Sequence, residues 1–193
     1  NSSRYQQQHQ KAIQAAAAVF AEKGYHGAST KDIATYMGIR QGSLYYYFSS
    51  KENALEEVCL MALHDYVDQM ERLSKQELPF NEKLAVAISA HLANYRNKPD
   101  ALKVHNEQRL YLPQEKREKI KSLGSKYRQQ LEDILVEGAH NRLLSTPLDC
   151  HFATLSLIGL CNPWGAMLSR DTNLDLQEIT AKCTHFALNG CLG

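Results

Sequence analysis

Apolar residues recur every three or four positions through most of this chain, which is the spacing of one face of an amphipathic helix. Residues such as Gly24, Gly38 and Pro113 stand between these segments, where they end one helix or begin the next. The pattern predicts about nine helices, over residues 12–23, 29–37, 41–48, 49–74, 81–98, 100–112, 113–144, 146–170 and 175–192. No segment is convincing as a strand, so the sequence predicts an all-α fold.

Several of these helices begin at residues that satisfy the unpaired backbone groups of a first turn. Ser29 with Asp32, and Ser49 with Glu52, have the spacing of a capping box. Thr146 followed by Pro147 combines an N-cap with a proline at the first helical position. The last helix is predicted to begin at Asp175, three residues before Glu178.

The segments over 29–37 and 41–48 form the most informative pair. The first ends at Gly38, and the second places Leu44 and Phe48 on one face at i and i+4. Two short helices joined by a tight turn with glycine are typical of a helix-turn-helix, although an ordinary αα-hairpin has the same local pattern.

Surface chemistry favours the DNA-binding alternative. The second segment exposes three consecutive tyrosines, residues 45–47, and hydroxyls, amides and ammonium groups suit phosphates and base edges. Residues 1–51 carry a net charge of +4 and the remainder −3, within a total of +1. This asymmetry is expected where one end of a protein meets a polyanion.

Residues 12–55 resemble the N-terminal domain of the TetR/AcrR family of transcriptional regulators, over about the first quarter of the chain. The shared motif reads Phe20-x3-Gly24-Tyr25, Ser29-Thr30-x2-Ile33-Ala34 and Gly38-Ile39-x2-Gly42-Ser43-Leu44-Tyr45-x-Tyr47-Phe48-x2-Lys51-Glu52-x2-Leu55. Arg40 departs from it, because family members often carry Ser or Thr there as the helix cap. The resemblance implies a regulator that binds a palindromic operator in double-stranded DNA as a homodimer and is released by a small effector.

The resemblance and the residue chemistry together give a set of expected DNA contacts. Gln41 and Gly42 are expected at base edges, with Arg40 at a base or a phosphate. The phosphate backbone is expected to meet Thr30, Lys31, Ser43, Tyr45, Tyr46, Tyr47 and Lys51. On this basis residues 1–50 form the DNA-binding domain, and residues 51–193 the domain for ligand binding and dimerisation.

The effector is expected within the second domain, among side chains that are apolar or amphipathic. The candidates are Tyr66, Met70, His91, Tyr95, His105, Arg109, Tyr127, Cys161, Asn162 and Trp164. Arg109 suits an anionic head group. Residues 157–164 are similar to the penultimate helix of family members that respond to fatty or aromatic acyl-CoA compounds.

The helices over 146–170 and 175–192 are rich in apolar residues, so the chain's own core or another chain must cover them. The family resemblance pairs them across a two-fold axis, with an interface at Phe152, Leu155, Gly159, Ile179, Cys183 and Phe186. An alternative is a DNA-binding protein whose second domain only dimerises or recruits a partner. An interior cavity of several hundred cubic ångströms would favour the effector hypothesis.

Other classes of protein find little support. Neither a Gly-x-Ser-x-Gly elbow nor a phosphate-binding glycine loop appears, so an enzyme is not expected, and no cofactor is implied. The five cysteines have no CxxC spacing, which favours reduced thiols and gives no closed metal-ligand set. No apolar run approaches the roughly 18 residues that span a membrane, and a cytoplasmic location is expected.

Overall fold

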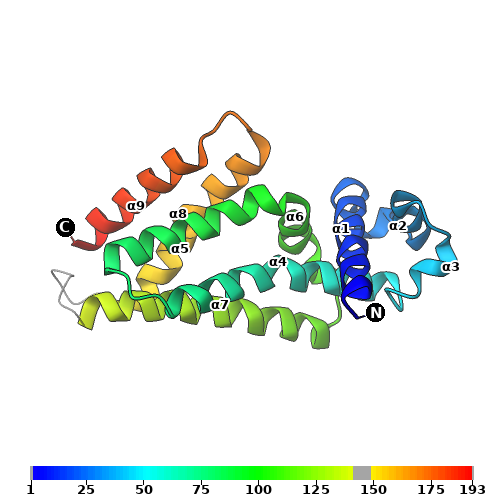
Figure 1. Cartoon of the computed structure of the whole chain (residues 1–193), viewed down its shortest axis with the longest axis horizontal. Coiled ribbons are helices and arrows are strands. Elements are labelled where there is room, and N and C mark those ends of the chain that lie inside the picture. The colour runs from blue at the N-terminus through cyan, green and yellow to red at the C-terminus, as the bar shows by residue number, and fades with distance from the viewer. Residues whose placement is uncertain (1, 141–148, 193) are drawn as a thin grey trace. The chain divides into compact units, whose positions relative to one another are not determined.

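The computed structural model describes residues 2–140 and 149–192, with the side chains of Ser2, Cys191 and Leu192 excepted. Within these residues the fold is all-α, as predicted, and no strand occurs (Figure 1). The elements are α1 (Ser2–Gly27), α2 (Thr30–Met37), α3 (Gln41–Leu44), α4 (Lys51–Ser74), α5 (Phe80–Asn97), α6 (Pro99–Gln108), the 3₁₀ helix η1 (Arg109–Tyr111), α7 (Gln114–His140), α8 (Cys150–Arg170) and α9 (Leu176–Leu192).

The chain forms two compact units that interleave along the sequence. The first unit comprises the residues up to 64 together with 98–122, and the second comprises 65–97 together with the residues from 123 onward. Helices α4 and α7 therefore contribute their first turns to the first unit and their later turns to the second.

The first helix is longer than the apolar pattern predicts. It begins at Ser2 instead of residue 12, because its first three turns pack through aromatic side chains rather than through a regular aliphatic face. Gly24 interrupts the helix as predicted, with φ 72° and ψ 163°, values that a glycine adopts without steric cost. One further turn then ends at Gly27.

The third helix is shorter than predicted. α3 ends at Leu44 instead of residue 48, and the chain continues in turns in which the Tyr46 amide donates to the Ser43 carbonyl at 3.2 Å. Leu44 and Phe48 are both buried, as their spacing predicted.

The start of α4 corrects the predicted capping box by one residue. Ser50 Oγ, not Ser49, accepts from the amide of Asn53 at 3.0 Å, and Asn53 Oδ1 accepts from the amide of Ser49 at 3.1 Å. The side-chain caps are therefore supplied by Ser50 and Asn53, and Glu52 is left to form an ion pair with Lys116.

The ends of the later helices are described only in part. The predicted cap at Thr146 and Pro147, and the predicted end of the seventh helix at residue 144, lie outside the described residues. The described start of α8 is capped by Asp149, whose Oδ1 accepts from the Phe152 amide at 2.9 Å. At α9 the prediction is confirmed, because Asp175 Oδ1 accepts from the Glu178 amide at 2.8 Å.

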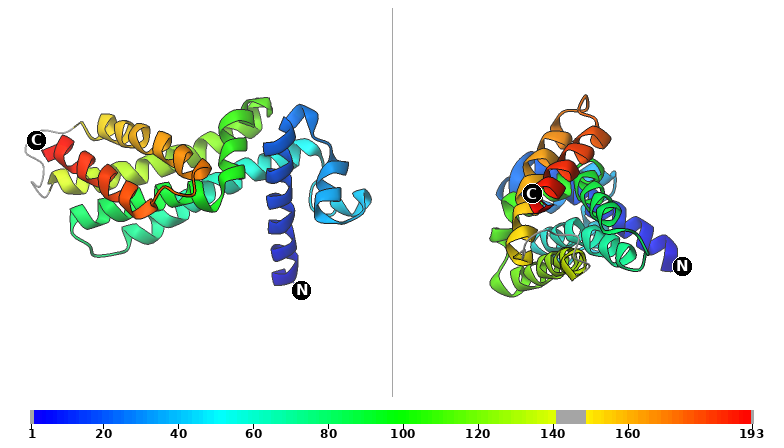
Figure 2. Two further views of the ribbon diagram at one scale, coloured as in Figure 1. Left: turned by 90° about the horizontal axis from the view of Figure 1, so that it is seen from above. Right: turned by 90° about the vertical axis from the view of Figure 1, so that its left-hand side faces the viewer.

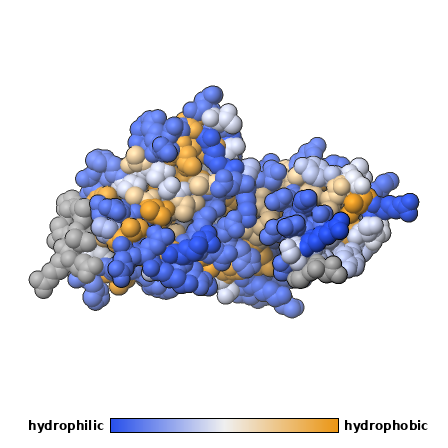
Figure 3. Space-filling model, viewed as in Figure 1, coloured by the Kyte–Doolittle hydropathy of each residue, from blue (hydrophilic) through white to orange (hydrophobic). Residues whose placement is uncertain are grey.

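Each unit has its own apolar core. In the first unit α1 packs on α2 and α6, and the largest fully buried side chains of this unit are Phe20, Ile33, Leu44, Phe48, Leu55 and Val58. In the second unit α5 packs on both α8 and α9, which run side by side in opposite directions (Figure 2), and the fully buried side chains are Leu73, Leu84, Ile88, Leu92, Leu135 and Leu168. The surface seen in Figure 3 is mainly hydrophilic, with hydrophobic residues scattered among polar ones.

Candidate nucleic-acid interface and bundle core

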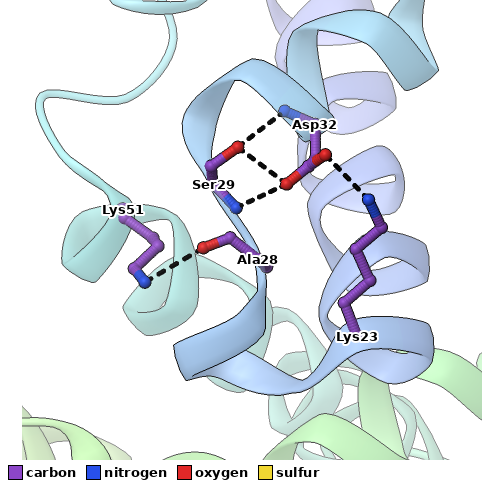
Figure 4. Close-up of polar contacts among 5 residues, drawn as sticks. All are labelled: Lys23, Ala28, Ser29, Asp32 and Lys51. Atoms are coloured by element: carbon purple, nitrogen blue, oxygen red, sulfur yellow. Dashed lines mark hydrogen bonds and ion pairs between the residues drawn. The ribbon is translucent and has the colours of Figure 1, made fainter.

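The start of α2 is fixed by a capping box that the sequence predicted. Ser29 Oγ accepts from the Asp32 amide at 3.1 Å, and Asp32 Oδ2 accepts from the Ser29 amide at 2.8 Å (Figure 4). Asp32 Oδ1 also accepts from the Lys23 ammonium at 2.7 Å. These bonds to Lys23 and Ser29 lower the pKa of Asp32 to about 2, so the box stays ionised and closed at neutral pH.

The turn between α2 and α3 depends on Gly38. Its φ of 69° and ψ of 29° lie in the left-handed region, which glycine tolerates best. The Gly38 amide donates to the Thr35 carbonyl and the Ile39 amide to the Ala34 carbonyl, both at 3.0 Å. The last carbonyl groups of α2 therefore find their hydrogen-bond donors within the turn, and the turn sets the direction of α3.

The turn presents the predicted DNA contacts on one small part of the first unit, which we call the DNA face. Gln41 is linked to α2, because its Nε2 donates to Thr30 Oγ1 at 3.0 Å. The DNA face consists of the half-buried Thr30 and Tyr47 and the exposed Lys31, Arg40, Gln41, Gly42, Ser43, Tyr45 and Tyr46. The neighbouring residues Tyr45 and Tyr46 are 55% and 75% exposed, and contiguous exposed aromatic surface is typical of an interaction site.

Two aromatic residues beside the DNA face were not found from the sequence. The ring of Tyr5 in α1 lies 5.8 Å from that of Tyr46 and 6.2 Å from that of Tyr47, and His9 stacks on Tyr47 at 6.3 Å. The only local signal was the i, i+4 spacing of Tyr5 and His9 in a glutamine-rich stretch. Their partners lie some forty residues away in the chain, so periodicity alone could not identify them.

Lys51 lies differently from the other predicted DNA contacts. Its ammonium donates to the backbone carbonyls of Tyr25 at 2.8 Å and Ala28 at 3.0 Å, and lies 4.4 Å from the centre of the Tyr25 ring. Lys51 thus provides a hydrogen-bond donor for backbone carbonyls at the end of α1, and it links that end to α4 (Figure 4). Its role as a phosphate contact stays a prediction, because two of its three donors are already used.

The second unit contains a chain of polar side chains that runs from its buried core to the exposed Asn162, which we call the His91 network. His91 Nδ1 lies 2.7 Å from the Tyr127 hydroxyl, and His91 Nε2 lies 2.9 Å from Asn162 Oδ1. Asn162 Oδ1 also accepts from the Tyr95 hydroxyl at 3.0 Å. These four residues, from α5, α7 and α8, are joined by the buried Tyr66 of α4, whose ring centre lies 5.0 Å from those of His91 and Tyr127.

The network is fully satisfied when His91 is neutral. An amide oxygen only accepts, so His91 Nε2 carries the hydrogen, and Nδ1 is free to accept from Tyr127. Burial lowers the pKa of His91 to about 4, and burial also raises the pKa of Tyr66 and of Tyr127. All three side chains are consequently uncharged at neutral pH, as an apolar core requires.

A small cavity adjoins this network. It has a volume of about 10 Å³ and is lined by Ala87, Ile88, His91, Tyr127, Leu131, Leu157, Ile158 and Cys161. Such a volume holds about one water molecule, so this cavity is far smaller than a small-molecule pocket of about 300–1,000 Å³.

The predicted effector residues fall into two groups. Tyr66, Met70, His91, Tyr95, Tyr127 and Cys161 are buried in the second unit, beside the half-buried Trp164 and the more exposed Asn162. His105 and Arg109 belong to the first unit, where Arg109 Nη1 donates to the carbonyls of His105 at 3.1 Å and Asn106 at 2.7 Å. This nitrogen of Arg109 therefore already donates to carbonyl groups in the last turn of α6.

The predicted interface residues also fall into two groups, which differ in how far they are exposed in the single chain. Phe152 and Phe186 are each 68% exposed and Leu155 is 48% exposed, as residues awaiting a partner would be. Gly159 is exposed as well. Ile179 and Cys183 are 5% and 3% exposed in the single chain, where α9 packs on the protomer's own α5 and α8, so their place in an interface stays a prediction.

Comparisons with known proteins bear on both units. The family model of the tetR family of bacterial regulatory proteins matches residues 12–58, and the model of the tetracyclin repressor-like C-terminal domain matches residues 77–191. The chain belongs to the TetR family. It is a DNA-binding transcriptional regulator and not an enzyme.

Among the relatives of this TetR-family chain is the fatty acid metabolism regulator protein of Bacillus subtilis strain 168, 30% identical over 147 residues that cover 76% of each chain. The crystal structure of the regulator FadR from Bacillus subtilis in complex with stearoyl-CoA has a TM-score of 0.78 at 26% identity, over 94% of this chain and 98% of that one. The regulator PfmR from Thermus thermophilus has a TM-score of 0.84 at 24% identity, over 92% and 97%. This last likeness concerns the fold.

The described residues offer little support for a metal site or a reactive thiol. Groups of three or more His, Cys, Asp or Glu side chains that are placed to hold a metal ion do not occur there. Burial raises the pKa of both Cys59 and Cys161 to about 12, so these thiols stay protonated at neutral pH. None of the described helices is long and apolar enough to cross a membrane.

Proposed function

We propose that this TetR-family protein is a repressor that binds a roughly palindromic operator as a homodimer and is released by a long-chain acyl-CoA. The effector class rests on one observation above all, the stearoyl-CoA complex of a FadR that is 26% identical over 94% of this chain. We place its action in the cytoplasm, where it meets DNA and acyl-CoA esters together.

The proposed DNA contacts follow from the DNA face. Gln41 and Gly42 approach base edges, with Arg40 beside them, while the remaining side chains of the DNA face, together with Lys51, contact phosphates. The bond from Gln41 to Thr30 orients the amide before DNA arrives, which lowers the entropic cost of binding.

The proposed effector region is the core of the second unit around the His91 network. The apolar helices supply a lining for an acyl chain, and Tyr95, His91 and Asn162 supply a few polar groups. The cavity of about 10 Å³ beside the network is too small for such a chain, so an effector that enters at this point would have to separate these helices.

Helix α4 provides a covalent link for the response. It begins at Lys51, directly after the DNA face, and carries Tyr66, which packs against His91. An effector that favours a different position of α4 changes DNA affinity by its preference for that state, about 1–3 kcal/mol in typical allosteric proteins. We accordingly assign DNA binding to residues 1–50 and effector binding with dimerisation to residues 51–193.

Selection of duplexes from a random-sequence pool with the purified protein tests the DNA part of the proposal. The expected result is a site with two-fold symmetry and half-site centres about 34 Å apart. Gln41→Ala should then relax the preference at one or two base pairs, by about 1–3 kcal/mol each, while Lys31→Ala weakens binding to all sequences. A consensus without symmetry would contradict binding as a homodimer.

Stearoyl-CoA added to the complex with the selected duplex tests the effector part. Release is expected with stearoyl-CoA and not with free coenzyme A or with stearate at the same concentration. If stearoyl-CoA and shorter acyl-CoA esters all leave the complex intact, the alternative is favoured, in which the second unit only dimerises. The small size of the cavity beside the His91 network is the observation that favours this alternative.

A further inference from the structure

The first three turns of α1 lie against the DNA face. Tyr5 contacts Tyr46 and Tyr47 through its ring, and His9 contacts Tyr47 and Phe48. His9 Nε2 also lies 3.2 Å from Glu57 Oε2, which connects this part of α1 to α4. All of these contacts lie within the first unit, so the turns have a fixed place beside the residues that meet DNA.

This segment is also basic. Arg4 and Lys11 are exposed, and their spacing of seven residues places them on the same side of α1, roughly 10 Å apart along its axis. The acidic residues among positions 1–51 are Glu22 and Asp32, and Asp32 is already paired with Lys23. Glu57 of α4, the acid beside these turns of α1, lies against His9. The two cations therefore add to the positive potential of the DNA face.

We propose that Arg4 and Lys11 contact operator phosphates outside the base pairs read by α3, and that Tyr5 acts as a positioning residue for Tyr46 and Tyr47. The occupant is DNA because the segment continues the DNA face through direct ring contacts and carries the complementary charge. The match to the family's DNA-binding model begins only at residue 12, so this contact extends beyond the shared motif.

The two roles have different signatures in salt. A cation that neutralises a phosphate releases counterions, so its loss reduces the slope of log K against log salt by about 0.9 for each contact. In a homodimer each substitution removes two contacts, which gives a change of about 1.8. Tyr5 carries no charge, so its loss should lower affinity and leave the slope unchanged.

The experiment measures binding of full-length variants to the duplex selected with the wild-type protein, by fluorescence anisotropy at several salt concentrations. Arg4→Ala and Lys11→Ala should each make the slope shallower by about 1.8, and the double variant by about 3.6. Tyr5→Leu should weaken binding several-fold at every salt concentration with the wild-type slope. Lys75→Ala is the matched control, since Lys75 is an exposed lysine of the second unit that pairs with Glu71.

Wild-type slopes and affinities for both Arg4→Ala and Lys11→Ala would overturn the proposal, while the DNA binding of the wild-type protein would stand. Circular dichroism checks that each variant keeps its helices. For Tyr5, the variant Tyr5→Phe keeps the ring contacts, so it should bind as the wild type does. Equal losses for Tyr5→Phe and Tyr5→Leu would show that the ring does not act by positioning its neighbours.

Discussion

Lys51 joins the end of α1 to the start of α4 through one ammonium group. Its bonds to the carbonyls of Tyr25 and Ala28 occupy the end of α1, and its own backbone begins α4. A hydrogen bond from a charged donor contributes about 1.5–3 kcal/mol to stability, more than a bond between neutral groups. The residue is therefore expected to matter for stability even without DNA.

Lys51→Met keeps the aliphatic stem and removes the ammonium. The expected loss of unfolding free energy is about 1–3 kcal/mol, measured by urea denaturation without DNA. Lys31→Met is the control, because Lys31 is exposed on the DNA face and its loss should change stability by less than about 0.5 kcal/mol. Equal stability of the two variants would contradict the structural role of Lys51.

His91 makes stability depend on pH. Its pKa is about 4 in the folded protein against 6.5 for the ordinary side chain, so between these values the unfolded chain binds a proton that the folded protein does not. Stability attributable to His91 is thus full above about pH 6.5 and decreases as the pH falls towards 4. The shift corresponds to about 3 kcal/mol in total.

The measurement compares wild type with His91→Gln, which has amide hydrogen-bonding groups and no titration in this range. Unfolding free energies at pH 7, 6, 5 and 4.5 should fall more steeply for the wild type, while carboxylate contributions are common to both proteins. Parallel curves would mean that the imidazole is not held neutral by the core.

At the scale of an element, α8 depends on close contact with α5. A Cβ added to Gly165 would lie 2.3 Å from Tyr95 Cδ2, so the absence of a side chain allows the Tyr95 ring to pack on the backbone of α8. The same ring directs its hydroxyl to Asn162, one turn earlier in α8. Gly165 thereby helps to place one end of the His91 network.

Gly165→Ala should force the Tyr95 ring to move, at a cost of about 1–3 kcal/mol typical of overpacked cores. Gly124→Ala is the control in α7, because the nearest atom to its added Cβ is Arg128 Nη1 at 3.5 Å, an ordinary contact. That variant should gain about 0.5–1 kcal/mol from the reduced entropy of the unfolded chain. Thermal denaturation of both variants checks the prediction, and a stabilised Gly165→Ala would refute it.

At the scale of the whole molecule, the exposed apolar residues of α8 and α9 indicate an assembly. Phe152, Leu155, Met167 and Phe186 have exposed fractions between 48% and 68% in the single chain. Helix faces of this kind are covered in stable proteins, and a two-fold arrangement of α8 and α9 would cover them.

Phe186→Glu should therefore dissociate the dimer, and it should lower affinity for the selected palindromic duplex because each protomer then binds a half-site alone. Sedimentation velocity at micromolar concentration and a gel-shift assay measure the two effects. Val86→Glu is the control, since Val86 is a 43% exposed apolar residue of α5 that is not among the predicted interface residues. A wild-type protein that sediments as a monomer would exclude the proposed assembly.

The sequence by itself determined the features that depend on neighbours a few residues away. The Ser29–Asp32 box, the left-handed Gly38 and the cap at Asp175 were all predicted, because each is a bond or a backbone angle within one turn. The helical spacing of apolar residues likewise predicted the all-α fold, and the family motif predicted the DNA face.

Only the tertiary structure decided which distant groups meet. The partners of Lys51 lie more than twenty residues away, those of Tyr5 about forty, and Asn162 lies seventy-one residues from His91. Periodicity shows that a face is apolar, but it does not show whether the protomer or a partner covers that face. For this reason the sequence predicted an interface role for Ile179 and Cys183, and only the structure shows that both are already buried in the single chain, where α9 packs on α5 and α8.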